Sequence, residues 1–208
     1  LLQLCFTIAA VQTLIIVGNL AALIVSSIAM SMSLNRLLLF YGDRRGAVLA
    51  ARKKFVASRL ADAALIASGV CLYLVFGSLD YATVFAGAAE VASANTLVLG
   101  ATLLIAIAAL LKSAQLPLHG WILEVMETPT PVSALLHAGI INAGGFLIIR
   151  FADLVTLSPP ALHVLAVIGL ITALFGSLVM LTQTSVKVSL AYSTIAQMGF
   201  MLLQCGLG

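Results

Sequence analysis

Charged residues are scarce in this chain. Asp, Glu, Lys and Arg make up 8% of its 208 residues, whereas soluble domains contain about 25%. Hydrophobic residues account for 62%, and the mean hydropathy is +1.20. So few charges could not cover a water-soluble fold of this size. This excludes a soluble domain and indicates a membrane protein that crosses the bilayer several times.

Cysteine is rare, and catalytic motifs are missing. Cys5, Cys71 and Cys205 stand singly in apolar runs, as small buried hydrophobic residues do, without the spacing of a metal site or a disulfide. There is no phosphate-binding glycine loop, no Cys/His ligand cluster and no nucleophile–base pair. We therefore expect neither an enzyme in this chain by itself nor a metal or cofactor bound to it.

The first residues do not form a signal peptide. The stretch LLQLCFTIAAVQ lacks a basic region and a small-residue cleavage site. The chain starts inside a hydrophobic segment, without Met, and stops at Gly208 just after another one. This predicts a fragment of a longer protein, with residues 1–208 forming a single transmembrane domain.

Seven segments are long enough to cross a hydrocarbon core, which needs about 20 apolar residues. They are predicted near 2–17, 20–41, 55–77, 95–116, 131–150, 160–182 and 186–207. Gly18 and Asn19 form a tight turn between the first two. The fold class is therefore all-α, a polytopic transmembrane helix bundle of about seven spans.

The basic residues predict the orientation of the bundle. Most of the ten Lys and Arg lie in the second connection, at Arg36, Arg44, Arg45, Arg52, Lys53, Lys54 and Arg59. By the positive-inside rule, this 36–59 connection is cytoplasmic, and 78–94, with Asp80 and Glu90, is outside. Contact with lipid headgroups explains the basic cluster better than nucleic-acid binding does. We expect a multi-pass protein of a bacterial inner (plasma) membrane.

Lys112 is the residue that most suggests a function. It follows the apolar run Thr96–Leu111, where a lysine costs roughly 2.5–3.5 kcal/mol on insertion scales. One interpretation is a lysine that extends to the inner interface. The other is a buried group that takes and releases protons during transport.

Prolines follow Lys112 closely. Pro117 removes a backbone donor and predicts a helix break, and broken helices mark ion pathways in many transporters. An ordinary helix end is the alternative. Pro129 and Pro131 belong to the same interruption, and Pro131 is expected in the first turn of the next helix.

Two further titratable groups could continue a relay. His137 can exchange protons near neutral pH, and a structural role is equally compatible with its position. Lys187 is either an interface anchor or a relay group. Tyr192 and Ser193 follow it with helical spacing and could line a wet path or join helices.

Other polar residues are candidate supporting groups. Glu124 and Glu127 flank the break and could either pair with Lys112 or face solvent. Ser113 follows Lys112, and His163 lies near the outer end of its segment, where anchoring is expected. Asp62, one turn after Arg59, is predicted to be a partly buried carboxylate paired with a nearby cation.

Several motifs resemble one known family. KSAQLPLHGW, PTPVSALLHAG, QTSVKVSLAYSTIAQMGFM and FVASRLAD are similar to motifs of the antiporter-like proton-translocating membrane subunits. That family includes the largest such subunit of NADH:quinone oxidoreductase and the large Mrp-type sodium/proton antiporter subunit. The resemblance covers nearly the whole chain in order.

The resemblance implies a larger bundle of some fourteen helices, with broken helices and a central axis of buried lysine, histidine and glutamate. Lys112 would be the central lysine of the broken helix, His137 the next relay group and Lys187 the lysine of the following motif. In respiratory members a glutamate of the second segment pairs with the central lysine. Here the aligned residue is Ile28, and Ser185 replaces an aspartate. Lys112 would therefore lack its usual counter-charge.

That departure, with VMETPTPVSALLHAG and GGFLIIR, resembles the membrane subunits of DAB inorganic carbon transporters. The resemblance implies a DabA-type partner, a zinc protein similar to β-carbonic anhydrase, which would hold the zinc. Its function would be to conduct a proton or sodium ion and so energise CO2/bicarbonate uptake. The alternatives are a respiratory NADH:quinone oxidoreductase subunit, an Mrp-type antiporter subunit or a membrane scaffold. Lys112, His137 and Lys187 would form the relay.

Overall fold

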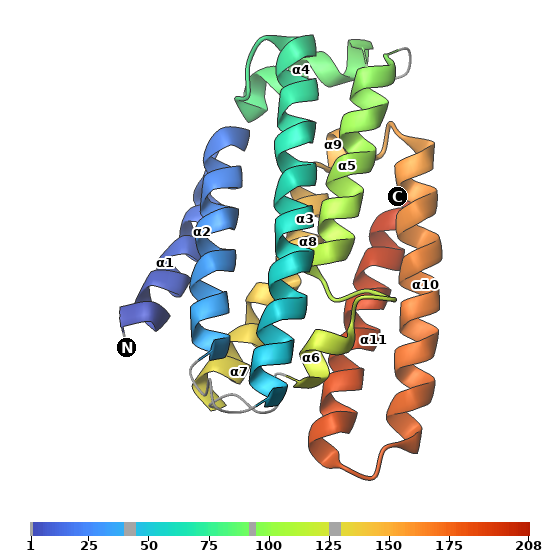
Figure 1. Ribbon diagram of the computed structural model, residues 1–208. Helices are drawn as coiled ribbons and strands as arrows, with labels where there is room; N and C mark the ends of the chain where they lie inside the picture. Colours follow the sequence, from blue (N-terminus) through green and yellow to red (C-terminus); the bar gives the residue numbers. More distant parts are fainter. Residues whose placement is uncertain (1, 40–44, 92–94, 125–129) are drawn as a thin grey trace.

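A computed structural model describes residues 2–39, 45–91, 95–124 and 130–208, which form a bundle of α-helices (Figure 1). The helices are α1 Leu2–Ile16, α2 Leu20–Leu38, α3 Arg45–Phe76, α4 Tyr81–Val91, α5 Thr96–Lys112, α6 Gly120–Glu124, α7 Thr130–Ala138, α8 Ala143–Arg150, α9 Ala152–Val155, α10 Pro159–Thr182 and α11 Val186–Leu207, with a 3₁₀ helix, η3, at Ile140–Asn142. The all-α class is confirmed.

Among the described residues, five stretches are long and apolar enough to cross a membrane by length and composition. They are Leu20–Leu38, Val48–Phe76, Pro131–Arg150, Pro159–Thr182 and Val186–Leu207. The apolar helices Leu2–Ile16 and Thr96–Lys112 are shorter. These seven stretches coincide with the seven predicted segments, within a few residues at most ends.

The third segment begins earlier than predicted. The prediction placed it at 55–77, but α3 starts at Arg45 and runs for 32 residues. The sequence from Arg45 to Arg59 is rich in Ala, Arg and Lys, which favour helix. Much of the basic sequence was therefore wrongly assigned to a connection, since Arg52, Lys53, Lys54 and Arg59 lie on a helix.

Two other elements also differ from the prediction. The stretch 78–94 was expected to be a connection, but it contains α4. The segment 131–150 was expected to be one helix, but α7 ends at Ala138 and η3 separates it from α8. The sequence between them, Gly139 to Asn142, forms a tighter 3₁₀ turn, which commonly occurs at interruptions of α-helices. His137 therefore lies in the last turn before a second irregular segment.

The predicted outer end of the bundle is joined by short polar contacts. Asn19 caps α2 by accepting a hydrogen bond from the Ala21 N–H at 2.8 Å, and its amide also donates to Asp80. The Arg150 guanidinium donates to the Val17 carbonyl at 3.0 Å. The turn predicted at Gly18 and Asn19 is present, and these contacts fix it against the start of α4.

Helices α10 and α11 form an antiparallel hairpin packed through small residues (Figure 1). A Cβ added at Gly199 would lie 2.5 Å from the Ala173 nitrogen and 2.8 Å from the Gly169 carbonyl oxygen. Only a glycine allows the two backbones to approach so closely. This contact fixes the position of α10, which the broken helix needs as a partner.

Candidate ion-translocation site

The candidate site begins where α5 ends, at Lys112. Ala114 takes a left-handed conformation with φ 51°, which turns the chain out of the helix. The chain then crosses toward α10 before it returns as α6 (Figure 1). The predicted break after Lys112 is therefore present, and Pro117 lies within it.

Neighbouring groups satisfy the polar backbone of the break, as a membrane interior requires. The Leu116 N–H donates to Thr172 Oγ1 on α10 at 3.2 Å. The Gln115 side chain donates to the Ser113 carbonyl at 3.2 Å, and the Ser113 hydroxyl donates to the Ala109 carbonyl at 2.7 Å. The irregular chain is thus fixed to the middle of α10.

Lys112 forms a buried ion pair with Asp62 of α3. Its Nζ lies 2.8 Å from Asp62 Oδ1, and both residues are 3% exposed. The Ser27 hydroxyl donates to the same oxygen at 3.3 Å, and Arg59 Nη2 lies 2.7 Å from Asp62 Oδ2. The Lys112 ammonium is therefore held inside the bundle, and it does not extend to the interface.

The usual counter-charge of Lys112 is absent, since Ile28 stands where respiratory members have the glutamate of the second segment. Lys112 nevertheless has a counter-charge, which the sequence analysis did not predict. The carboxylate comes instead from α3, close to the middle of that helix. Asp62 was predicted to be partly buried beside a cation. The pairing is confirmed, but the burial is nearly complete and Lys112 is a second partner.

A signal for this pairing is present in the sequence. Lys54, Ser58 and Asp62 recur every four residues on α3, and all three are buried. A polar row with helical spacing inside an apolar helix indicates an inward-facing functional face. The sequence analysis missed it because Lys54 was assigned to the basic connection.

An aromatic cluster lies beyond the break. The ring centroid of His119 lies 5.3 Å from that of Phe175 on α10 and 6.4 Å from that of Tyr192 on α11. His119 was not among the predicted site residues, although it lies in the LPLHGW motif. Tyr192 was among them, and its ring lies beside that of His119.

His137 and Lys187 come together in a polar hollow. The His137 Nδ1 lies 3.2 Å from Thr194 Oγ1 on α11. The hollow of about 420 Å³ is lined by Ser133, His137, Lys187, Leu190, Ser193, Thr194 and Gln197. The structure thus joins three predicted residues, His137, Lys187 and Ser193, while the Lys187 side chain remains exposed.

The remaining predicted residues do not join this group. His163 is exposed near the start of α10 and about 13 Å along the helix axis from Thr172, by the rise per residue. Pro131 lies in the first turn of α7, as predicted. Pro129 and Glu127 lie outside the described residues, and the side chain of Glu124 is likewise not described.

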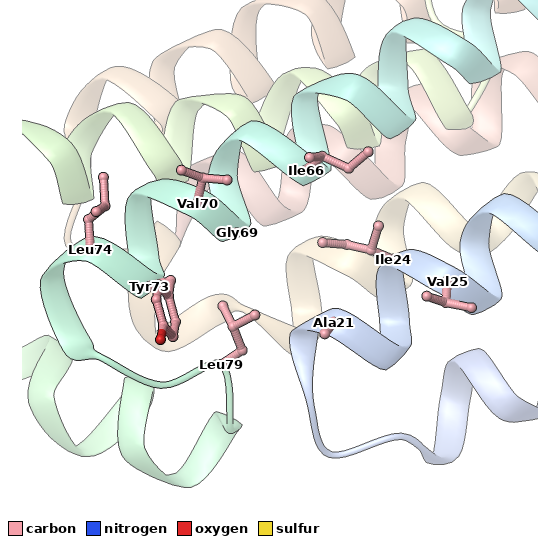
Figure 2. A pocket seen from close by; sticks show the side chains of 9 residues that line it. All are labelled: Ala21, Ile24, Val25, Ile66, Gly69, Val70, Tyr73, Leu74 and Leu79. Carbon is pink, nitrogen blue, oxygen red and sulfur yellow. The ribbon is translucent and has the colours of Figure 1, made fainter.

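An apolar groove lies elsewhere, between α2 and α3. It has a volume of about 510 Å³ and is lined by Ala21, Ile24, Val25, Ile66, Gly69, Val70, Tyr73, Leu74 and Leu79 (Figure 2). Several of these side chains are exposed and apolar, as suits a lipid-facing surface. The groove contains no ionisable partner for the Lys112 pair and is separate from the site. Among the residues that the structure describes, no group of three or more His, Cys, Asp or Glu gathers as metal ligands would.

The described residues thus include a buried lysine–carboxylate pair beside a broken helix, with a histidine and a lysine on later helices. The family described as "NADH:quinone oxidoreductase/Mrp antiporter, TM" matches residues 5–208. The chain belongs to this family. It is therefore a multi-pass membrane subunit of the antiporter-like type.

Two kinds of protein are similar to this chain in sequence. The chain is 50% identical over 205 residues to the probable inorganic carbon transporter subunit DabB of Hydrogenovibrio crunogenus, which covers 99% of this chain and 40% of that protein. It is 38% identical over 202 residues to NADH-quinone oxidoreductase subunit L of Mycobacterium tuberculosis, covering 97% of the chain and 32% of that protein. The chain therefore spans less than half the length of these relatives.

A solved structure supports the same fold. The bundle matches a chain of the Mrp complex from Dietzia sp. with a TM-score of 0.91 and 26% sequence identity, over 98% of this chain and 22% of that one. The antiporter-like bundle implied by the sequence motifs is thus confirmed at the level of family and fold.

Proposed function

We propose that this chain is the cation-conducting membrane subunit of an inorganic carbon transporter. Protons, or sodium ions, move inward down their gradient through it, and this movement energises CO2/bicarbonate uptake by a partner subunit. The observation that carries the proposal is the Lys112–Asp62 pair, buried at the end of a broken helix. The similarity to probable inorganic carbon transporter subunits supports the choice of cargo.

The pair has the properties that a translocation step needs. Lys112 is held by a carboxylate that also contacts Arg59, so a small movement of Asp62 changes the stability of the lysine's charge. The break beside it is held by few hydrogen bonds, which allows local rearrangement. Changing the protonation of Lys112 would therefore alter the contact between α3 and α5.

The relay would continue from Lys112 toward α11. The break contacts Thr172 on α10, and His119 and Phe175 lead to Tyr192 on α11. His137 and Lys187 then share the polar hollow. A proton could pass between His137 and Lys187 through water, because most of the side chains that line the hollow with them carry a hydroxyl or an amide.

The partner would be a zinc-binding subunit of the DabA type, similar to β-carbonic anhydrase. Zinc would lie in that subunit, where it would supply the hydration chemistry that interconverts CO2 and bicarbonate. The contribution of the present chain is to hold and move charge across the membrane.

The experiment is Lys112→Ala in the full-length subunit, assembled with its partner. We expect that a carbonic-anhydrase-deficient host carrying this variant no longer grows without added bicarbonate, although the variant is expressed and assembled normally. The matched control is Arg36→Ala, which removes an exposed cation. Undiminished growth of the Lys112→Ala strain would refute a relay role.

A second candidate function is a respiratory or Mrp-type subunit. Such a subunit requires a carboxylate close to Lys112, and Asp62 supplies one. Co-purification with flavin and iron–sulfur proteins would favour the respiratory subunit, and sodium efflux from everted vesicles would favour the antiporter. Co-purification with a large zinc protein would reject both.

A further inference from the structure

Lys54 is a second lysine buried in the bundle. It is 4% exposed and lies on the same face of α3 as Ser58 and Asp62. Its Nζ lies over the indole ring of Trp121, 4.6 Å from the ring centroid. The face of an aromatic ring attracts a cation electrostatically, and this attraction partly replaces the stabilisation that water would give to the charge. The ammonium is thus held in a defined position.

The charges around Lys54 do not balance. It lies within electrostatic range of both Lys112 and Asp62, and Arg59 also pairs with Asp62. Within the described part of the chain, the carboxylate that faces these three cations is that of Asp62. Keeping all three charged inside the bundle is costly. Arg59 cannot release its proton, but either lysine can.

Unpartnered polar atoms surround the two lysines. The Ser58 hydroxyl lies between Lys54 and Asp62 on α3, the indole N–H of Trp121 belongs to the ring beneath Lys54, and the side-chain amide oxygen Oε1 of Gln115 lies three residues after Lys112. All three atoms are buried and have no protein hydrogen-bond partner within the described residues. Buried polar groups are normally satisfied by protein or by water. Water molecules between the lysines would satisfy these atoms and connect the two amines.

The Lys54 end of this row is close to the basic end of the bundle. Trp121 also lines a hollow of about 510 Å³ whose wall includes Arg52 and Lys53, both exposed. Exposed cations of this kind lie at headgroup level, where water is available. By the positive-inside rule, this end is cytoplasmic.

We propose that Lys54 exchanges protons between the Lys112–Asp62 pair and the cytoplasmic end of the bundle. The Lys112 ammonium gives its proton through water, past Ser58, to the neutral amine of Lys54. The proton then leaves Lys54 beside Trp121. This inference rests on the proposed function, because it adds an exchange residue to the same route.

The first test compares Lys54→Arg with Lys54→Met in the full-length subunit assembled with its partner. Arginine keeps the charge and stacks on Trp121 but does not release a proton. We expect both variants to lower the rate of labelled bicarbonate uptake by at least about tenfold, while co-purification with the partner is retained. Lys53→Arg and Lys53→Met, on the exposed face of α3, are the matched controls and should keep uptake.

Retention of uptake by Lys54→Arg would overturn the proposal, because charge and stacking would then suffice. Retention by Lys54→Met would overturn it as well. If neither variant assembles, the second test decides.

The second test leaves Lys54 intact and obstructs the route. Ser58→Val replaces a buried hydroxyl between Lys54 and Asp62 with methyl groups, and it should slow uptake. Ser68→Val makes the same change at another buried, unpartnered hydroxyl of α3, beyond Asp62, and should leave uptake unchanged. Equal uptake by both variants would overturn the proposal.

Lys112→Ala in the same assay separates this inference from the proposed function. Loss of uptake in Lys112→Ala with full uptake in the Lys54 and Ser58 variants would reject the inference alone. Full uptake in Lys112→Ala would reject the proposed function.

Discussion

Lys112 and Asp62 are each tolerated in the bundle because the other is present. An isolated ion in a low-dielectric interior costs several kcal/mol, and a close partner with further hydrogen bonds offsets most of that cost. Ser27 and Arg59 add the further contacts. Such a pair is weak evidence for stability, since apolar residues would fill the space as well. Its retention is better explained by function.

A double-mutant cycle tests this balance. Asp62→Leu alone leaves the buried Lys112 charge without its partner and should lower the free energy of unfolding by about 3–5 kcal/mol, whereas Lys112→Met leaves Asp62 paired with Arg59 and should cost less. The double variant removes both charges and should lose much less than the sum. Unfolding in detergent, followed by circular dichroism, measures this, with the exposed Arg36→Met as control. Strictly additive losses would contradict the pairing.

The broken helix illustrates what an element needs from its neighbours. Helix α5 ends at Lys112 although no proline occurs until Pro117, because the chain turns at Ala114 and finds new hydrogen-bond partners. The decisive partner is Thr172, in the middle of α10. The break is therefore stable only if α10 is in place.

Thr172→Val should loosen this connection without changing side-chain volume. It removes the acceptor for the Leu116 N–H and should cost about 1–3 kcal/mol, the penalty for an unsatisfied buried donor. We also expect slower uptake, because the break holds Lys112. The control is Thr182→Val, whose exposed hydroxyl makes only local bonds, to the Val179 carbonyl and from the adjacent Gln183 side chain. Equal thermal stability of the two variants would argue against the connection.

The close packing of α10 and α11 can be tested by replacing a glycine with alanine at two sites, one inside the contact and one outside it. Gly199→Ala places a methyl group against the α10 backbone and should lower the melting temperature. Gly100→Ala, in α5, meets nothing within 4 Å and should be neutral or stabilising by up to about 1 kcal/mol, because alanine favours helix. The melting temperatures of the two variants, measured in the same detergent, test this prediction. A lower melting temperature for Gly100→Ala than for Gly199→Ala would refute the close packing.

At the scale of the whole molecule, the candidate relay residues lie on four helices. Lys54 and Asp62 are on α3, Lys112 ends α5, and His137 on α7 and Lys187 on α11 line the same hollow. The surrounding surface is apolar, with a groove such as that in Figure 2. Lys54, Asp62 and Lys112 are inside the bundle, whereas Lys187 is exposed. The basic start of α3 and helix α4 lie at opposite ends of the bundle (Figure 1).

The orientation of the bundle predicts opposite labelling of two loops. In a background without the native cysteines, Leu157→Cys, at an exposed site beside α9, should react with an impermeant maleimide in intact cells. Ser185→Cys, exposed between α10 and α11, should react only in inverted vesicles. The reversed labelling pattern would contradict the predicted orientation, and labelling of both residues from the same side would show that α10 does not cross the bilayer.

The sequence alone determined the class of this protein, the approximate spans and the break after Lys112. These follow from local properties, because apolar length, proline and a cluster of cations act within a few turns of the chain. The motifs around Lys112, His137 and Lys187 also sufficed for the family. The orientation of the bundle remains a prediction.

Only the tertiary structure decided which groups meet. The partner of Lys112 is Asp62, fifty positions earlier in the chain, and no local pattern pairs two residues on different helices. The four-residue spacing of Lys54, Ser58 and Asp62 indicates an inward face of α3, but the contact of Lys54 with Trp121 and that of Leu116 with Thr172 depend on how other elements pack around the break. A charge can be recognised from sequence, but its energy depends on the neighbours that folding provides.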